Sequence, residues 1–160
     1  LKSMSKVKNQ ILELLQVNNI EFKHMQHPAA ETSQEVAKLR GTDPNIGAKA
    51  LLIKTKQDYY LCVLEAPKKL DSKKFRQATG IKKMRFINQE ELLEKFQLLR
   101  GAVPPFGNLL DISQTFFDIG LLKHKKLAFN IGTKTESILI DTQDLVQLVK
   151  PEIIEFCESV

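Results

Sequence analysis

Lys49 is the residue of this sequence whose position most suggests chemistry. It follows Gly47 and stands at the start of the apolar run 48–53, where a loop enters an expected strand. An ammonium group at the mouth of a pocket can present a point charge to a phosphate or a carbonyl. A lysine beside a buried run can also be an edge residue, with its stem on apolar surface and its charge in water. Spacing alone favours this second interpretation.

The loop 101–107, with the sequence GAVPPFG, is a second candidate. Two glycines bracket two prolines, so the middle of the loop is stiff while its ends can adopt unusual backbone angles. Such a loop can aim fixed backbone N–H groups at a substrate carbonyl or a developing oxyanion. The alternative interpretation is a rigid surface connection.

Common catalytic signatures are missing from the sequence. It has no phosphate-binding glycine loop, dinucleotide fingerprint, nucleophile elbow or metalloprotease motif, and no histidine has metal-ligand spacing. Cys62 and Cys157 form no C-x-x-C pair, and Cys62 falls in an apolar run typical of a buried thiol. The sequence therefore predicts an activity without metal, cofactor or classical protein nucleophile. The cysteine usage favours a cytoplasmic location.

Positive charge is concentrated in residues 68–85. This segment carries +7, whereas the whole chain carries +5, so the remaining residues sum to −2. One-sided charge suits a polyanionic partner, although a solvated helix face is an equal alternative. The residues expected to contact the partner are Lys68, Lys69, Lys73, Lys74, Arg76, Lys82 and Lys83, with Arg85 at the end of the segment.

These candidates must be positioned by a mixture of helices and hairpins. Hydrophobic spacing predicts a helix over 5–17, and capping signals predict four more, starting after Thr32, Asp71, Asn88 and Asp141 or Thr142. Strands are expected at 21–25, 48–55, 59–65, 83–87, 109–112, 126–130 and 137–140, with a final helical turn from Pro151. Hairpins without regular β–α alternation favour an α+β fold, with a mixed, largely antiparallel sheet covered by helices.

A length of 160 residues, 42% of them hydrophobic, indicates a single domain over residues 1–160. Residues 1–3 are read either as a remnant before a natural start at Met4 or as a sign that the chain is cut from a longer protein. No apolar run approaches the length of a membrane span, and the N-terminus is too polar for a signal peptide. No membrane partner is expected.

Ordered motifs along the chain resemble the YbaK/prolyl-tRNA deacylase-like family, editing domains that occur alone and inside prolyl-tRNA synthetases. The resemblance extends roughly from Ser5 to Lys150. It rests on His27-Pro28 followed by Thr32, on the segment 48–51, on 60–64 followed by Leu70-Asp71, on the G-x-x-x-P-F-G pattern of 101–107, and on Asp118 followed by Asn130-Ile131-Gly132.

The resemblance implies proofreading in trans or in cis, by hydrolysis of the ester between a wrong amino acid and a tRNA, tRNA(Pro) being the expected one. It implies that Lys49, Gly101 and Pro105 are catalytic and that water attacks the ester. It implies substrate-binding roles for His27, Thr32, Ala48, Pro104, Phe106, Gly107, Asp118, Asn130 and Gly132. The expected partners are the acceptor end of a mischarged tRNA and, as a further candidate, an aminoacyl-tRNA synthetase.

One departure from the family bears on the substrate. The alanine-specific branch carries a histidine-proline pair near residues 130–132, and this sequence has Asn-Ile-Gly there. Alanine is therefore not the favoured amino acid. Two other functions stay open: a catalytically inert tRNA- or synthetase-binding module of the same fold, and hydrolysis of another small acyl or prolyl ester without tRNA.

Overall fold

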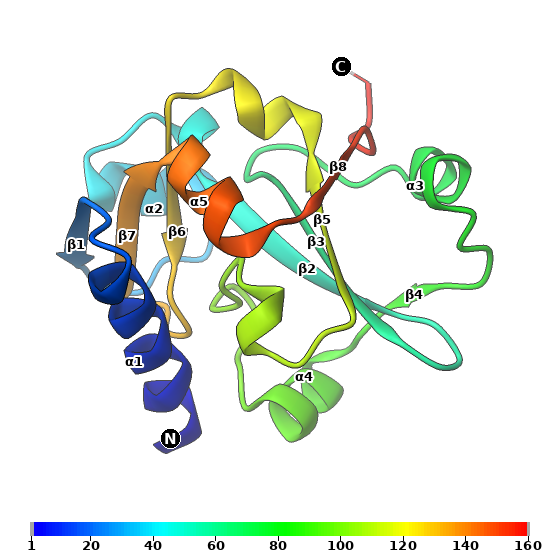
Figure 1. Cartoon of the computed structure of the whole chain (residues 1–160), viewed down its shortest axis with the longest axis horizontal. Coiled ribbons are helices and arrows are strands. Elements are labelled where there is room, and N and C mark those ends of the chain that lie inside the picture. The colour runs from blue at the N-terminus through cyan, green and yellow to red at the C-terminus, as the bar shows by residue number, and fades with distance from the viewer. Residues whose placement is uncertain (1, 160) are drawn as a thin grey trace.

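Two β-sheets form the centre of the molecule (Figure 1). The computed structural model describes residues 2–159. The three-stranded sheet is antiparallel, in the order β1 (Phe22–Gln26), β7 (Glu136–Asp141) and β6 (Lys126–Asn130). The five-stranded sheet has the order β4 (Arg85–Phe86), β2 (Ala48–Lys54), β3 (Tyr59–Glu65), β5 (Gln114–Asp118) and β8 (Glu152–Ile154).

Strand pairing is mixed only in the larger sheet. β2 pairs antiparallel with β3 and β4, whereas β3–β5 and β5–β8 are parallel. The expected α+β class with a mixed, largely antiparallel arrangement is confirmed, but the strands divide between two sheets. A single bridge between Gly47 and Ala128 joins the sheets next to the start of β2.

The four helices with capping signals begin where the sequence places them, whereas α1 begins at Lys2, three residues before the expected start. Asp71 accepts the N–H groups of Lys73 and Lys74, and Asn88 forms a complete capping box with Glu91. The α-helices are α1 (Lys2–Val17), α2 (Ser33–Arg40), α3 (Ser72–Thr79), α4 (Gln89–Phe96) and α5 (Thr142–Val149), with short 3-10 turns at Pro44–Ile46, Gly107–Leu109 and Ile119–Lys123. Within residues 2–159, no helix has the length and apolar character needed to cross a bilayer.

Two expected elements are wrong. Residues 109–112 are not a strand, because the N–H groups of Leu110 and Ile112 both donate to the Gly107 carbonyl and fold the chain back. The strand begins later, as β5. Pro151 does not start a helical turn: α5 ends at Lys150 with a left-handed φ of 52°, and the next residues pair with β5 as strand β8.

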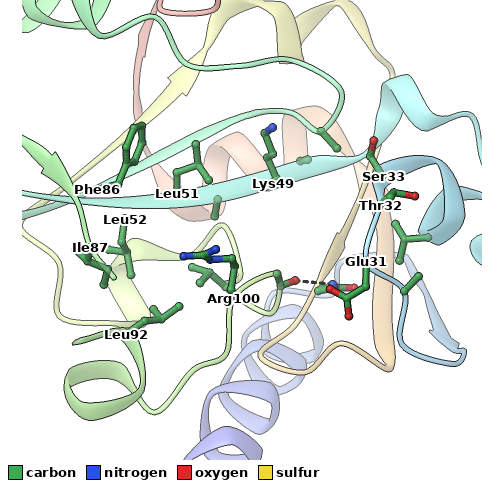
Figure 2. A pocket seen from close by; sticks show the side chains of 18 of the residues that line it. Glu31, Thr32, Ser33, Lys49, Leu51, Leu52, Phe86, Ile87, Leu92 and Arg100 are labelled. Atoms are coloured by element: carbon green, nitrogen blue, oxygen red, sulfur yellow. Dashed lines mark hydrogen bonds between the residues drawn. The ribbon is translucent and has the colours of Figure 1, made fainter. Parts of the chain in front are cut away.

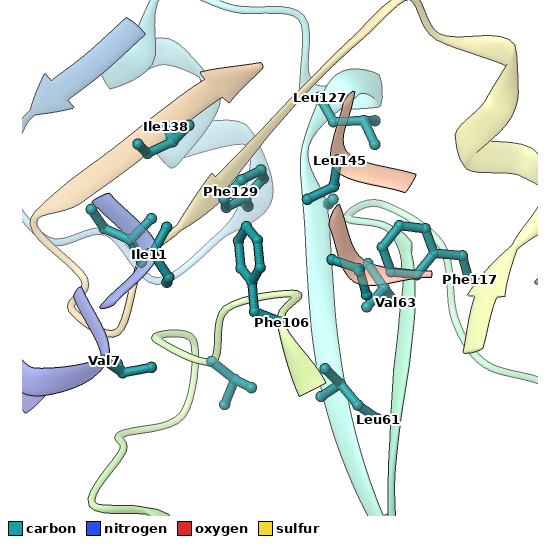
Figure 3. Close-up of a cluster of buried hydrophobic side chains, with 14 of the residues drawn as sticks. Val7, Ile11, Leu61, Val63, Phe106, Phe117, Leu127, Phe129, Ile138 and Leu145 are labelled. Atoms are coloured by element: carbon teal, nitrogen blue, oxygen red, sulfur yellow. The ribbon is translucent and has the colours of Figure 1, made fainter. Parts of the chain in front are cut away.

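Hydrophobic side chains form two clusters on opposite faces of β2. Ala48 and Leu52 belong to the larger cluster, where Phe106 meets Phe129 edge to face with ring centroids 5.7 Å apart (Figure 3). Ile53 belongs to the smaller cluster, which lies under α3. Alternate residues of β2 therefore face different surroundings, as the two-residue period of a strand requires.

Candidate active site

A cavity of about 630 Å³ opens along one edge of β2. On its other edge β2 pairs with β3 over its whole length, whereas β4 is two residues long and covers only Ile53 and Lys54. The segment 48–52 therefore forms a largely free strand edge. Side chains from the loop before α2, from α2, β4, α4 and the loop 101–107 complete the wall.

The main chain of Ala50 faces this free edge. Ala66 N–H donates to the Gly47 carbonyl on the β3 side, whereas Ile87 N–H donates to the Leu52 carbonyl on the β4 side. Peptide groups of alternate residues point to opposite edges in an antiparallel ladder. Ala50 has the parity of Leu52, and no described strand pairs with it there, so its N–H and C=O line the cavity.

Lys49 lines the cavity and is half-buried. Burial lowers the pKa of its ammonium group below the ordinary lysine value; Cys157 opposes this shift and nearby Lys69 adds to it. Figure 2 shows Lys49 and Leu51 on one side of the β2 ribbon, with Leu52 on the other. The sequence interpretation of Lys49 as a cation at a pocket is consistent with this position.

Arg40 is a buried cation that the sequence analysis missed. Only 8% of the residue is exposed, and it lines the cavity. Its Nε donates to Ser137 Oγ at 2.8 Å and its Nη2 to Asn130 Oδ1 at 3.1 Å. Burial lowers the pKa of Arg40 to about 10, and no carboxylate among residues 2–159 forms an ion pair with it. A buried charge without a counter-charge is costly, which favours an anionic or strongly polar ligand.

The loop 101–107 is fixed by strand β6 and the turn after it. Asn130 Nδ2 donates to the Gly101 carbonyl at 2.7 Å, and Gly132 N–H donates to the Ala102 carbonyl at 2.9 Å. Gly101 has a φ of +86°, which disfavours any residue with a side chain. The N–H groups of Gly101 and Val103, both cavity residues, have no acceptor among the described residues. They are free to bind a ligand oxygen.

The predicted site residues divide into three groups, the third being Asp118 alone. Lys49, Gly101, Thr32, Ala48 and Asn130 line the cavity together. A second group lies behind the cavity wall: His27 Nε2 contacts Ser137 Oγ at 2.7 Å, and Ser137 in turn bonds to the cavity residues Arg40 and Asn130. The buried residues Pro104, Pro105, Phe106, Gly107 and Gly132 support the loop.

The supporting residues have packing reasons for their identity. Phe106 is fully buried in the larger cluster. Gly107 lies against Thr115, whose hydroxyl would collide with an added Cβ. These residues therefore support the cavity wall without lining it. Of the loop 101–107, only Gly101 and Val103 line the cavity.

Asp118 lies away from Lys49 and lines a second cavity of about 380 Å³. Its Oδ1 accepts the N–H groups of Phe156 and Cys157 at 2.8 and 3.2 Å, and its Oδ2 accepts the N–H of Gly120 at 2.8 Å. The structure therefore does not bring Asp118 to the other predicted site residues. Its carboxylate ties the C-terminal segment to the five-stranded sheet.

Two further cavity residues also escaped the sequence analysis. Arg100 directly precedes Gly101, and Phe86, in β4, is 49% exposed. Arg40 resembled an ordinary cation in the last turn of a helix, where it complements the helix dipole. Of Arg40, Phe86 and Arg100, only Arg100 could have been found from the sequence, because it directly precedes the loop 101–107.

Most of the basic segment 68–85 is exposed. Lys74 is an exception, because its Nζ donates to the Cys157 carbonyl and to Ser159 Oγ, at 2.9 and 3.0 Å. Arg85 is exposed, but its guanidinium pairs with Glu91. Exposed residues without an ion pair among the described side chains are Lys69, Lys73, Arg76, Lys82 and Lys83. Lys69 is close enough to Lys49 for its charge to lower the pKa of the Lys49 ammonium group.

Comparisons with known proteins find a matching family and relatives of similar length. A family model described as the aminoacyl-tRNA editing domain matches residues 27–148. The chain is 25% identical to the multifunctional Ser/Thr-tRNA deacylase ProXp-y of Escherichia coli K12, covering 91% of this chain and 90% of the relative. It is 24% identical to the prolyl-tRNA editing protein ProX of Acetoanaerobium sticklandii, covering 89% and 90%.

A solved structure provisionally assigned as a trans-editing enzyme for prolyl-tRNA synthetase has the same fold. Its TM-score is 0.81 at 21% identity, over 96% of this chain and 98% of that one. The matched family segment contains Lys49, Arg40, Asn130 and the loop 101–107, which are the residues that build the cavity. The chain therefore belongs to the aminoacyl-tRNA editing domain family, the deacylases that proofread mischarged tRNA.

Proposed function

We propose that the cavity at the β2 edge hydrolyses mischarged tRNA(Pro), with a small polar amino acid as the group removed. The observation that carries this proposal is the surplus of donors in the cavity: three cations without a carboxylate partner among the described residues (Arg40, Lys49 and Arg100) and two backbone N–H groups without an acceptor. An aminoacyl ester at a tRNA 3′ end supplies the matching groups, namely a carbonyl oxygen and nearby phosphates.

In the proposed reaction, water adds to the ester carbonyl and the bond from that carbon to the ribose oxygen breaks. The ribose oxygen leaves with a proton, so the products are the free amino acid and uncharged tRNA. The N–H groups of Gly101 and Val103 receive the oxyanion that forms on the carbonyl oxygen. Lys49 holds the terminal nucleotide at the ester, and the residues from Pro104 to Gly107 keep the loop rigid.

Serine and threonine are the proposed amino acids. Asn130, Arg40 and the Thr32 hydroxyl make one end of the cavity polar, and the Escherichia coli relative is named as a Ser/Thr-tRNA deacylase. A hydroxyl-bearing side chain matches such an end better than a methyl group does, because buried polar groups left unpaired are costly. This also agrees with the missing histidine-proline pair near residue 130.

The exposed basic residues are proposed to contact the tRNA backbone. Counter-ion release then makes the affinity fall with salt. We also propose that the described residues act as one editing domain in the cytoplasm, where charged tRNA is used. The solved relative is described as a trans-editing enzyme for prolyl-tRNA synthetase, which supports that enzyme as a partner, testable by co-elution with the purified synthetase.

The deciding experiment is a deacylation panel. tRNA(Pro) charged with Ala, Ser, Cys, Thr or Pro, and tRNA(Ala) and tRNA(Thr) charged with serine, are incubated with the protein and assayed for remaining ester. The expected result is rapid loss of Ser- and Thr-tRNA(Pro), with Pro-tRNA(Pro) spared. Salt-sensitive tRNA binding with no turnover on any substrate would identify an inert binding module instead. Equal turnover of a simple aminoacyl ester lacking tRNA would identify a general esterase.

A further inference from the structure

The free edge of β2 separates the cavity into two faces of different chemistry. Lys49 and Leu51 lie on one face, and Phe86 joins them because it pairs with Ile53, which has the same parity. Ala48, Ala50 and Leu52 lie on the other face with Gly101, Val103 and Asn130. Figure 2 shows Phe86, Leu51 and Lys49 on one side of the ribbon and Leu52, Ile87 and Arg100 on the other.

We propose that the terminal adenine of the tRNA stacks on Phe86, on the face of Leu51 and Lys49, while the aminoacyl group crosses the β2 edge to Gly101. This inference rests on the proposed function and adds the orientation of the substrate. Phe86 is 49% exposed although it borders a cavity. Exposed aromatic rings beside basic grooves are the usual platforms for nucleic-acid bases.

Charge favours this orientation over the reverse one. The basic segment is next to Phe86 in sequence: Lys82 and Lys83 lie three and two residues before the start of β4 and are exposed, and Lys69 lies near Lys49. The opposite end of the cavity is bordered by Glu31, whose carboxylate pairs with Lys134 at 3.0 Å, and holds one buried cation, Arg40. Exposed positive charge is concentrated at the first end, which favours the phosphates there.

The spacing along the strand also fits. Lys49 and Ile53, the partner of Phe86, are four positions apart, which corresponds to about 13 Å of strand. A nucleotide with its phosphate near Lys49 and its base near Phe86 extends over a comparable length. The main-chain groups of Ala50 lie between the two faces, where the ribose and its ester would cross the edge.

The test is a double-mutant cycle that combines removal of the Phe86 ring with removal of the terminal adenine of the tRNA. KM and kcat are measured for wild type, Phe86→Ala, Phe86→Tyr and the exposed control Leu93→Ala, on the same mischarged tRNA with a terminal adenine or with an abasic terminal ribose. Since Phe86 and Leu93 are 49% and 46% exposed, circular dichroism and thermal melting are expected to show all variants folded.

On the normal substrate, Phe86→Ala is expected to raise KM about tenfold, within the range for losing one base–aromatic stack, and to change kcat less than twofold. Phe86→Tyr and Leu93→Ala are expected to behave like wild type. On the abasic substrate, wild type already has the raised KM and Phe86→Ala adds nothing.

An equal Phe86→Ala penalty on both substrates, or no penalty on either, overturns the inference. A changed preference among amino acids, with the base effect intact, places the acyl group at Phe86 and also overturns it. If wild type hydrolyses no substrate, the proposed function fails by itself. The same cycle, read as Kd values of uncharged tRNAs with and without the terminal base, then still decides whether Phe86 binds adenine.

Discussion

The two cavities described above both contain buried charged groups, but only the cavity at the β2 edge contains a buried cation without a carboxylate partner among the described residues. In the cavity of Asp118, both oxygens of the Asp118 carboxylate accept backbone N–H groups. The Glu65 carboxylate there contacts His124 at 2.8 Å and Lys123 at 3.8 Å. At the β2 edge, Arg40 and Lys49 lack a carboxylate and two N–H groups lack an acceptor. Satisfied groups indicate structure, and unsatisfied donors indicate a ligand site.

The comparison predicts its largest effect at Lys49. Lys49→Ala is expected to lower kcat/KM on the best mischarged tRNA by about 100-fold or more, because the terminal nucleotide is no longer held with its ester in the reactive position. Because Lys49 is only half-buried, its melting temperature is expected to change little. Lys126→Ala, an exposed lysine on β6, is the matched control. Wild-type turnover in Lys49→Ala would remove Lys49 from the catalytic group.

Asp118 is expected to show the opposite pattern. Asp118→Ala removes a buried carboxylate that accepts three N–H groups, so the free energy of unfolding is expected to fall by about 3 kcal/mol. The kcat per folded molecule stays near wild type. Urea denaturation and active-site-normalised turnover measure the two quantities. A stable but inactive Asp118→Ala would restore the substrate role that the sequence resemblance implies for Asp118.

Asn130 is both a cavity residue and a structural anchor of the loop 101–107, so its variant tests activity and stability together. Its side chain accepts from Arg40 and holds the Gly101 carbonyl. Asn130→Ala is expected to lower kcat about tenfold by loosening the loop that positions the oxyanion donors, and to cost about 1–3 kcal/mol of stability. Asn108→Ala, an exposed asparagine near the same loop, is the control. Unchanged kcat would show that the loop needs no anchor.

The pH dependence tests whether Lys49 acts as a cation. Burial lowers its pKa, so the ammonium loses its proton at a lower pH than an ordinary lysine does. Enzymatic kcat/KM, corrected for uncatalysed ester hydrolysis, is therefore expected to fall as pH rises through that lowered pKa. In Lys49→Arg the fall moves to higher pH, because arginine stays protonated. A rise in wild type over the same range would mean that the neutral amine acts as a base.

The smallest effect is expected on the basic surface. Lys82→Ala with Lys83→Ala is predicted to weaken tRNA binding a few-fold and to reduce the slope of log K against log salt by about 1 to 2. Lys74→Ala is the control, because its ammonium already binds the Cys157 carbonyl. Binding titrations at several salt concentrations measure both. An unchanged slope would make the segment a solvated face without a tRNA contact.

Local sequence signals predicted much of the fold. The Asn88 capping box, the hairpin of β2 and β3 and the break at Pro104-Pro105 depend on neighbouring residues and were recovered. β5 and β8 were not, because they form parallel pairs with strands distant in sequence. An apolar pattern alone could not decide between Leu109–Ile112 and the true strand at Gln114.

The site could be predicted only in part, again because it depends on contacts between residues that are distant in sequence. Motif order brought Lys49, Gly101 and Asn130 to one cavity, but motif order also included Asp118, which lies elsewhere. Arg40 could not be predicted, because its partners Ser137 and Asn130 are about 90 or more residues away in sequence. Burial and pairing are properties of the fold, and they distinguish the ligand site from the structural one.

The shortness of β4 has a consequence for solubility. A strand edge with unpaired peptide groups is a template on which another chain can add a strand, and such edges promote self-association. Two more residues of pairing beyond Phe86 would protect the segment near Ala50, but they would also close the cavity. The protein instead keeps the segment short and bordered by Lys49 and Arg100, whose like charges disfavour the approach of a second copy. A bound substrate would cover the same edge, so aggregation at high concentration is expected to slow when tRNA is present.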